Sequence, residues 1–457
     1  IMKIFNSLSG KKETLVPIED NNIRMYVCGM TVYDDTHIGH ARTFVSFDLI
    51  VRYLRDLGYE VQYIRNITDV DDKIISRAKE LGWDPSDLVK KYISSMDEDF
   101  SALGMIKPDQ EPRATDNIDS IIRLIEILID KGHAYEGESD VYFSTESFES
   151  YGKLSKRKVE DMLAGARIDV DLDKKNPADF VLWKKDTEGL KWDSPWGPGR
   201  PGWHIECSAM SMDALGETFD IHGGGSDLKF PHHENEIAQS ECVTGKEFAK
   251  VWMHTGSLRI DKEKMSKSLK NFITIKDALK HNTSEVLRFF LISSHYRSPL
   301  NYSEEGLSES KTSLDRLYNA LKDLTLEENL VSKSNYFKKF HDVMKDDFNT
   351  PAGISVLFEM AREINSLKKD HKEEEANALG SELKVLSKSL GILQQNPDDF
   401  FKAGASLSEE EIDNLIKKRN EARSNRDFKL ADEIRDDLLS KGIVLEDKES
   451  GTVWKKD

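Results

Sequence analysis

The stretch from Trp203 to Glu236 combines residue types that bind metals and nucleotides. It contains Cys207, then a run of three glycines, and then His232 and Glu236. Because the last two are four residues apart, a helix would place imidazole and carboxylate on one face. Two further ligands of suitable type would complete a zinc site. An ion pair on a solvated helix surface has the same spacing, so this pattern alone does not decide between the two.

A pair of histidines, His37 and His40, encloses Ile38 and Gly39. At the start of a helix, unpaired N–H groups and the helix dipole favour anions. Two imidazoles there could hydrogen-bond phosphate oxygens and stabilise the charge that develops during transfer at phosphorus. Gly39 would let a ligand approach the backbone closely. Ordinary polar surface is the other interpretation.

Later in the chain, a segment with two lysines has the sequence Lys264-Met265-Ser266-Lys267-Ser268. Its two ammonium groups and two hydroxyl groups suit a mobile clamp that closes over a triphosphate. A solvated basic loop has the same composition. The two interpretations are separated only when this segment is considered together with His37 and His40.

An interrupted α/β sheet is predicted to position these groups. Strand, helix, strand and helix follow one another at the start of the chain, an order that indicates a parallel sheet with right-handed crossovers. Residues 115–205 begin with an amphipathic helix and continue as a turn-rich segment, which we interpret as an insertion between two halves of the sheet. The glycine run is expected to form the loop after its strand. The expected strands are 23–33, 59–67, 219–222 and 251–256, and the expected helices are 41–57, one from residue 71, 118–131 and 232–243.

Long helices are predicted beyond residue 275, followed by a small α/β unit at 407–457. The helices carry apolar residues at 3.6-residue or heptad spacing. The last unit is expected to contain a basic helix pair and two short strands. The expected helices of the first region are 275–296, 304–323, 337–345, 351–369 and 373–391.

Composition indicates a soluble protein of a reducing compartment. The chain has 457 residues, a net charge of -18 and three cysteines, which argues against a disulfide framework. No apolar run reaches the ~18–20 residues that a membrane span requires, and we see no signal-peptide pattern. The negative charge counts against non-specific coating of nucleic acid, although basic patches such as 153–158 and 417–429 could bind a specific RNA. We therefore expect a cytoplasmic protein without membrane contact.

Two motifs together carry a family resemblance. HIGH at residues 37–40 and KMSKS at 264–268 resemble, in this order, the paired signatures of class I aminoacyl-tRNA synthetases. Longer segments resemble cysteinyl-tRNA synthetase over essentially the whole chain, and on this basis the chain is identified as a member of that family. These segments are YVCGMTVYDDTHIGHAR, RNITDVDDKI, FVLWKK, PGWHIECSAM, FDIHGGGSDLKFPHHENEIAQSE, MSKSLKNF, HYRSPLNYSEE and GIVLEDKESGTVW.

The resemblance implies an α/β class I synthetase fold with a Rossmann-like parallel-sheet catalytic domain. An insertion divides this domain, and a helical bundle and a small C-terminal α/β appendix follow it. The implied reaction is ATP-dependent ligation of L-cysteine to tRNA(Cys) through a cysteinyl-adenylate, by a monomer that uses Mg²⁺ with ATP. The implied domains are the catalytic halves 1–114 and 206–260, the connective insertion 115–205, the KMSKS loop and stem-contact region 261–303, the tRNA-binding bundle 304–400 and the anticodon-recognition domain 401–457.

The resemblance also assigns roles to single residues. One Zn²⁺ per chain would bind the substrate's thiolate and so select cysteine over serine, which shape alone separates by only ~1–3 kcal/mol. Cys242 lies outside the zinc set and is interpreted as a buried thiol. The implied zinc ligands are Cys28, Cys207, His232 and Glu236; the catalytic residues are His37, His40, Lys264 and Lys267; the ATP-binding residues are His37, Gly39, His40, Gly223, Gly224, Gly225, Asp227, Lys264, Met265, Ser266, Lys267 and Ser268; and the cysteine-binding residues are Gly29, Thr31, Thr68 and Trp203.

One departure from the family pattern and two alternative functions remain. Lys270 stands where glycine is common, outside the five-residue loop, so we expect altered loop dynamics or RNA contact with intact catalysis. A related ligase that joins cysteine to an amino sugar shares the catalytic half but does not need the C-terminal appendix. A non-catalytic RNA-binding relative is disfavoured by the intact HIGH, KMSKS and zinc-ligand residues.

Overall fold

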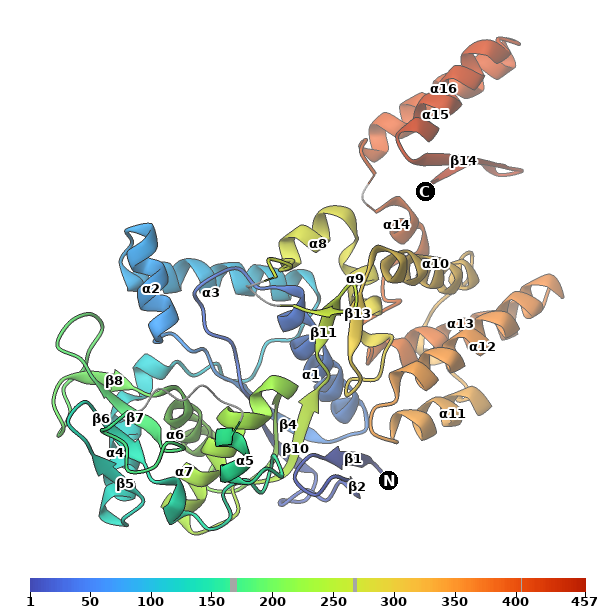
Figure 1. The fold of residues 1–457 in the computed structure, drawn as a ribbon. Coiled ribbons are helices and arrows are strands. Elements are labelled where there is room, and N and C mark those ends of the chain that lie inside the picture. Colours follow the sequence, from blue (N-terminus) through green and yellow to red (C-terminus); the bar gives the residue numbers. More distant parts are fainter. Residues whose placement is uncertain (165–170, 266–268, 404) are drawn as a thin grey trace.

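A four-stranded parallel sheet joins the two halves of the chain that the insertion separates. Figure 1 shows the computed structural model, which describes residues 1–164, 171–265, 269–403 and 405–457. The strand order β10-β9-β3-β4 sets a strand of the first half directly beside one of the second half. The predicted parallel α/β sheet is therefore confirmed. Its strands are β3 (Asn22–Val27), β4 (Glu60–Arg65), β9 (Phe219–Gly225) and β10 (Ala249–Thr255).

Helix α1 (Ile38–Asp56) follows β3 and buries its apolar face against the sheet. The helix begins three residues before the predicted start at Ala41 because His37 caps it. Nδ1 of His37 accepts a hydrogen bond from the backbone N–H of His40, and Nδ1 of His40 accepts one from the backbone N–H of His37, both at 3.2 Å. This reciprocal capping box satisfies two backbone donors that a helix start leaves unpaired.

The glycine run belongs to strand β9 and does not form the loop after it, so the loop prediction was wrong. Gly223, Gly224 and Gly225 pair with the last three residues of β10. A Cβ atom on Gly223 would lie 2.4 Å from the Phe47 ring of α1. The strand continues through glycine because the helix packs directly on its backbone, a close approach that no larger residue permits.

The insertion contains an antiparallel sheet that the turn-rich sequence did not predict. Helix α4 (Ile118–Asp130) confirms the predicted amphipathic helix and precedes the sheet. Short strands between Gly- and Pro-rich turns give little periodic signal, which explains why the sheet was missed. The strands, in spatial order, are β5 (Ala134–Glu136), β6 (Asp140–Phe143), β7 (Phe180–Lys185) and β8 (Gly199–Pro201).

Two helices replace the single helix predicted at 275–296. Helix α8 (Ile275–His281) ends before Asn282, and the Thr283 side chain caps α9 (Ser284–Ile292) by accepting a hydrogen bond from the N–H of Val286. The apolar periodicity continues across the break between α8 and α9, so the sequence pattern did not indicate the break. The bundle helices that follow are α10 (Glu304–Leu321), α11 (Asn335–Met344), α12 (Thr350–Lys369), α13 (Glu373–Lys388) and α14 (Pro397–Lys402).

The last unit extends away from the rest of the molecule beyond α14 (Figure 1). It has the predicted helix pair and strand pair, and a core of its own formed by Ile412, Ile416, Leu438, Ile443 and Trp454. Its elements are α15 (Glu409–Ser424), α16 (Phe428–Ser440), β14 (Ile443–Lys448) and β15 (Gly451–Lys456).

The remaining elements are β1 (Lys3–Asn6), β2 (Lys11–Thr14), α2 (Asp72–Leu81), α3 (Pro85–Ala102), α5 (Val159–Ala164), α6 (Trp203–Leu215), α7 (Glu234–Thr244), β11 (Leu258–Ile260), β12 (Glu263–Lys264) and β13 (Leu300–Tyr302). Within the described ranges, every helix is too short or too polar to cross a bilayer.

Candidate metal and nucleotide site

Four buried side chains from three parts of the chain meet beside the carboxyl end of β3. Cys28 follows β3 directly, Cys207 lies in α6, His232 lies in the turn before α7, and Glu236 lies in the first turn of α7. One ligand atom of each lies within 4.8 Å of all the others. The predicted helix at 232–243 begins two residues later than expected, yet Nε2 of His232 is 2.9 Å from Oε1 of Glu236. The prediction that these two groups share a face is confirmed.

The distances and the donor types in this cluster fit a zinc ion. The two sulfur atoms are 3.7 Å apart, and two thiolates at ~2.3 Å from a tetrahedral zinc would be about 3.8 Å apart. Sγ of Cys28 is 3.2 Å from Oε1 of Glu236. Nε2 of His232 is fully buried and makes no hydrogen bond, although this oxygen is near. Two sulfurs, one nitrogen and one oxygen are ligands that zinc accepts.

The electrostatics of the cluster favour the charged forms of Cys207 and Glu236, whereas burial and the neighbouring Cys207 raise the pKa of the Cys28 thiol well above its usual value. Burial alone would raise the pKa of Cys207, but a hydrogen bond from Cys28 and the positive charge of His232 lower it to about 6. Burial likewise opposes ionisation of Glu236, but the charges of His222 and His232 hold the pKa of its carboxyl well below the usual range. Cys207 can therefore be a thiolate and Glu236 a carboxylate at neutral pH, although both side chains are buried.

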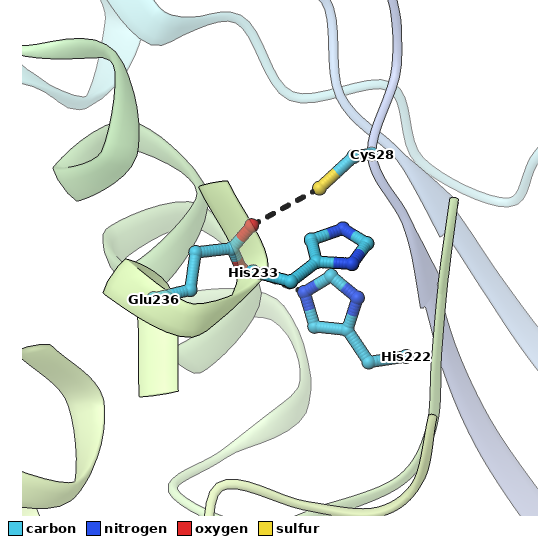
Figure 2. A group of neighbouring side chains, drawn as sticks. All are labelled: Cys28, His222, His233 and Glu236. Atoms are coloured by element: carbon cyan, nitrogen blue, oxygen red, sulfur yellow. Dashed lines mark hydrogen bonds and ion pairs between the residues drawn. The ribbon is translucent and has the colours of Figure 1, made fainter. Parts of the chain in front are cut away.

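A second set of ligand atoms, which the sequence analysis missed, overlaps the first. Figure 2 shows Cys28, His222, His233 and Glu236 converging, again with ligand atoms within 4.8 Å of one another. Nε2 of His222 lies 2.6 Å from Oε2 of Glu236, and Nδ1 of His233 lies 2.8 Å from Nε2 of His254. No signal in the sequence indicated His222, because its place near Cys28 follows from the pairing of β9 with β3.

A cavity of ≈ 760 Å³ adjoins the cluster, and many of the predicted site residues line it. Trp203 connects the two, since its indole stacks on the imidazole of His232 with ring centroids 4.0 Å apart. Gly223, Gly224 and Thr68 are buried and do not line the cavity, whereas Ser266, Lys267 and Ser268 lie outside the described residues. The predicted residues that line it are Cys28, Gly29, Thr31, His37, Gly39, His40, Trp203, Gly225, Asp227, Lys264 and Met265.

The two histidines of the HIGH motif stack on each other at the cavity wall. Their ring centroids are 3.6 Å apart, with an angle of 17° between the planes. Because each Nδ1 accepts a backbone N–H, the neutral rings carry their protons on Nε2. Burial, and then the neighbouring His37, hold the pKa of His40 well below its usual value. His40 is therefore a neutral hydrogen-bond donor, which suits a phosphate oxygen.

The segment after the KMSKS loop is hydrogen-bonded to the HIGH motif. The backbone N–H of Ile38 donates to the carbonyl of Ile273, and the N–H of Ile275 donates to the carbonyl of Thr36, both at 3.0 Å. On the other side of the loop, Met265 packs so closely on Gly39 that a Cβ there would lie 2.8 Å from its methyl group. Both ends of the loop are thus held against the motif that precedes it by more than 220 residues of sequence.

Comparison with known proteins identifies the family. A model described as tRNA synthetases class I (C) catalytic domain matches residues 14–312, a DALR domain model matches 339–394, and a cysteinyl-tRNA ligase anticodon binding domain model matches 407–454. Cysteine–tRNA ligase of Haemophilus influenzae (strain 86-028NP) is 54% identical over 459 residues, covering 100% of both chains. The chain belongs to the cysteine–tRNA ligase family. The family member from Marinobacter nauticus is 53% identical and covers 100% of this chain and 99% of its own.

The structural comparison supports the class I fold. Mycobacterium tuberculosis methionyl-tRNA synthetase in complex with methionyl-adenylate has a TM-score of 0.60 and covers 81% of this chain and 89% of its own. At 14% sequence identity the likeness concerns the fold alone. Together with the parallel sheet and the helical C-terminal regions, it confirms the predicted fold class for this cysteine–tRNA ligase family member.

Proposed function

We propose that this protein ligates L-cysteine to tRNA(Cys) with ATP, through a cysteinyl-adenylate. The observation that carries the proposal is the buried set of two thiols, an imidazole and a carboxylate that opens onto the cavity lined by the HIGH motif and Lys264. Relatives named cysteine–tRNA ligase match the chain from end to end, including residues 407–454. That C-terminal match disfavours the cysteine–amino sugar ligase, which does not need an anticodon-binding unit.

Zinc is proposed to bind Cys28, Cys207, His232 and Glu236 and not the overlapping second set. The first set has two sulfurs, and its Cys28 lines the cavity where the substrate would lie. In the second set, Nε2 of His222 is hydrogen-bonded to Glu236, so His222 is suited to orienting that ligand from behind, and Nδ1 of His233 is engaged by Nε2 of His254. Zinc would supply a thiolate-selective contact that serine, which offers only a hydroxyl, cannot match.

The first chemical step needs charge stabilisation and no protein nucleophile. A carboxylate oxygen of cysteine attacks the α-phosphorus of ATP, and the bond from that phosphorus to the bridging oxygen of pyrophosphate breaks. We assign the Nε2–H groups of His37 and His40 and the ammonium groups of Lys264 and Lys267 to stabilising the charge on the phosphate oxygens. Mg²⁺ bound with ATP supplies further positive charge at the phosphates. We assign Gly29, Thr31 and Trp203 to the cysteine side of the cavity and Gly225 and Asp227 to the adenosine side.

The second step transfers the cysteinyl group to RNA. A hydroxyl of the terminal adenosine of tRNA attacks the carbonyl carbon of the adenylate, and AMP leaves. We assign the bundle at 304–400 to contacts with the tRNA body and the unit at 401–457 to the anticodon, within the boundaries predicted from the sequence. The proposed protein acts as a cytoplasmic monomer.

A charging assay with cysteine and serine, with and without a zinc chelator, tests the proposal. We expect tRNA(Cys) to be charged with cysteine only, because a hydroxyl gains little from the metal, and we expect the chelator to abolish charging. Cysteine-dependent pyrophosphate exchange without tRNA charging would instead support the amino sugar ligase. Absence of both reactions would support the non-catalytic RNA-binding protein.

Lys270 has a backbone conformation that explains why glycine is common at its position. Its φ is +51°, in the left-handed region, which costs a non-glycine residue ~1 kcal/mol. Lys270→Gly removes this strain but adds backbone freedom at this position, so we expect adenylate formation to change less than tenfold. Pyrophosphate exchange measures this, and Lys270→Ala, which removes the charge but keeps the strain, is the matched control. A larger change in the glycine variant alone would mean that this backbone position controls catalysis.

A further inference from the structure

Two cations lie opposite each other on the hairpin that leads into the KMSKS loop. Arg259 in β11 pairs with Lys264 in β12, so the two side chains project from the same face of the hairpin. Both are exposed and both line the ≈ 760 Å³ cavity. Leu258 and Ile260, on the other face of β11, are buried. The hairpin therefore turns its apolar face to the core and its cationic face to the cavity.

This pair has no acidic partner among the residues that the structure describes. Neither Arg259 nor Lys264 takes part in an ion pair there, and Glu263, the acid beside them, pairs with Ile260 and so points to the opposite face. On the third strand, β13, the neighbour of Arg259 is the neutral Asn301. Like charges directly opposite on adjacent strands destabilise a sheet. An arrangement with this cost is explained by an anionic ligand that binds between the two side chains.

We propose that Arg259 binds the β- and γ-phosphates of ATP, and then the pyrophosphate product, beside Lys264. This inference rests on the proposed function, which places ATP in the cavity. The HIGH histidines line the same cavity, so a triphosphate held by them would lie in the space that Arg259 also lines. A guanidinium presents a planar pair of donors that matches two phosphate oxygens. Arg259 would act by binding alone, with no bond made or broken on its side chain.

Arg259 lies on the middle strand of its sheet, whereas Lys264 lies at the end of the edge strand β12. β11 is hydrogen-bonded on both sides, to β12 and to β13, so the backbone of Arg259 is fixed before a ligand binds. A group held on a rigid element loses less freedom on binding than a group on a loop. We therefore expect Arg259 to contribute to ATP affinity in the absence of cysteine and tRNA.

Titration of the full-length protein with ATP, ADP and AMP tests the proposal through Arg259→Met. Loss of a charge-assisted contact predicts ATP binding weaker by about 10-fold or more, with AMP binding changed by less than about twofold. The loss of ADP affinity should lie between the losses for ATP and AMP. Because repulsion between Arg259 and Lys264 is removed, the melting temperature without nucleotide is expected to stay the same or to rise. Arg259→Lys should restore part of the ATP affinity.

Arg123→Met is the matched control, since Arg123 is exposed on α4 in the insertion and does not line the cavity. It should leave all three affinities unchanged. Equal losses for ATP and AMP, or a lower melting temperature of Arg259→Met without nucleotide, would overturn the proposal in favour of a structural role. Reduced tRNA charging with unchanged ATP affinity would overturn it in favour of an RNA phosphate. If the unaltered protein bound ATP through Arg259 but failed to activate cysteine, the proposed function would fail and this inference would stand.

Discussion

Replacing Cys207 with serine is expected to lower cysteine activation by more than about 100-fold and to reduce zinc content far below one per chain. Changes behind the ligands of a metal already cost about 10–100-fold, so the loss of a sulfur ligand should cost more. Cys207 is buried, and its Sγ lies 3.7 Å from Sγ of Cys28. The hydroxyl of serine is a poorer zinc ligand than a thiol and has a much higher pKa. Metal analysis and cysteine-dependent pyrophosphate exchange measure the two effects.

Cys242→Ala provides the control for the cysteine substitution. Cys242 is also buried, but it packs in the hydrophobic core formed with α4 and the insertion sheet, outside both sets of ligand atoms. We expect this variant to keep its zinc and its activity. Affinity for tRNA separates folding from metal binding, because Cys207→Ser should bind tRNA about as well as the unaltered protein. Parallel loss of tRNA affinity and cysteine activation would show that Cys207 supports the fold.

Several elements of the catalytic half could be predicted because their signals are local, whereas others, among them β1, β2, α3 and α6, were not predicted. Apolar runs marked β3 and β4, helical periodicity marked α1, and a four-residue spacing brought His232 and Glu236 together. The start of α1 is set by the cap at His37, which the apolar periodicity does not include, so the periodicity placed the start of the helix too late. These features depend on a few neighbouring residues, so a single sequence contains them.

The assembly of the metal cluster could not be predicted from local signals. Cys28 lies 179 residues from Cys207, and the packing of α6 against β3 brings the two together. The family resemblance supplied that connection, but it gave no sign of His222 behind Glu236 or of His233 beside His254. Such contacts depend on how three helices and a sheet pack, which no spacing in the sequence records.

The basic patch of the C-terminal unit is smaller in the structure than in the sequence. Arg419 binds both carboxylate oxygens of Asp447, at 2.9 and 2.8 Å, and Arg423 binds the same residue at 2.9 Å. The bond with Arg419 holds the pKa of Asp447 well below its usual range. These two arginines therefore stabilise the unit itself, and Lys417, Lys418, Arg426 and Lys429 of the patch 417–429 remain for RNA.

Deleting residues 407–457 is expected to lower tRNA charging by about 100-fold or more, equal to ~3 kcal/mol of binding, while pyrophosphate exchange changes little. The unit has its own core, and among the described residues it meets the bundle through α14: by the Lys402–Glu409 ion pair at 2.7 Å, by the Lys402 ammonium over the Trp454 ring, and by the packing of α14 on β15. Its removal should therefore leave the sheet, the metal cluster and the cavity intact. The ratio of charging to exchange, measured on the same preparation, gives the effect.

A tRNA(Cys) with an altered anticodon distinguishes anticodon reading from general RNA affinity. The full-length protein should charge the altered tRNA far less well than the normal one, because side chains that contact unstacked bases carry specificity while phosphate contacts only position the RNA. The truncated protein should charge both tRNAs equally poorly. If truncation weakened charging of both tRNAs but preserved the preference for the normal anticodon, the specificity would have to reside in the bundle at 304–400. The C-terminal unit would then serve only as a phosphate contact.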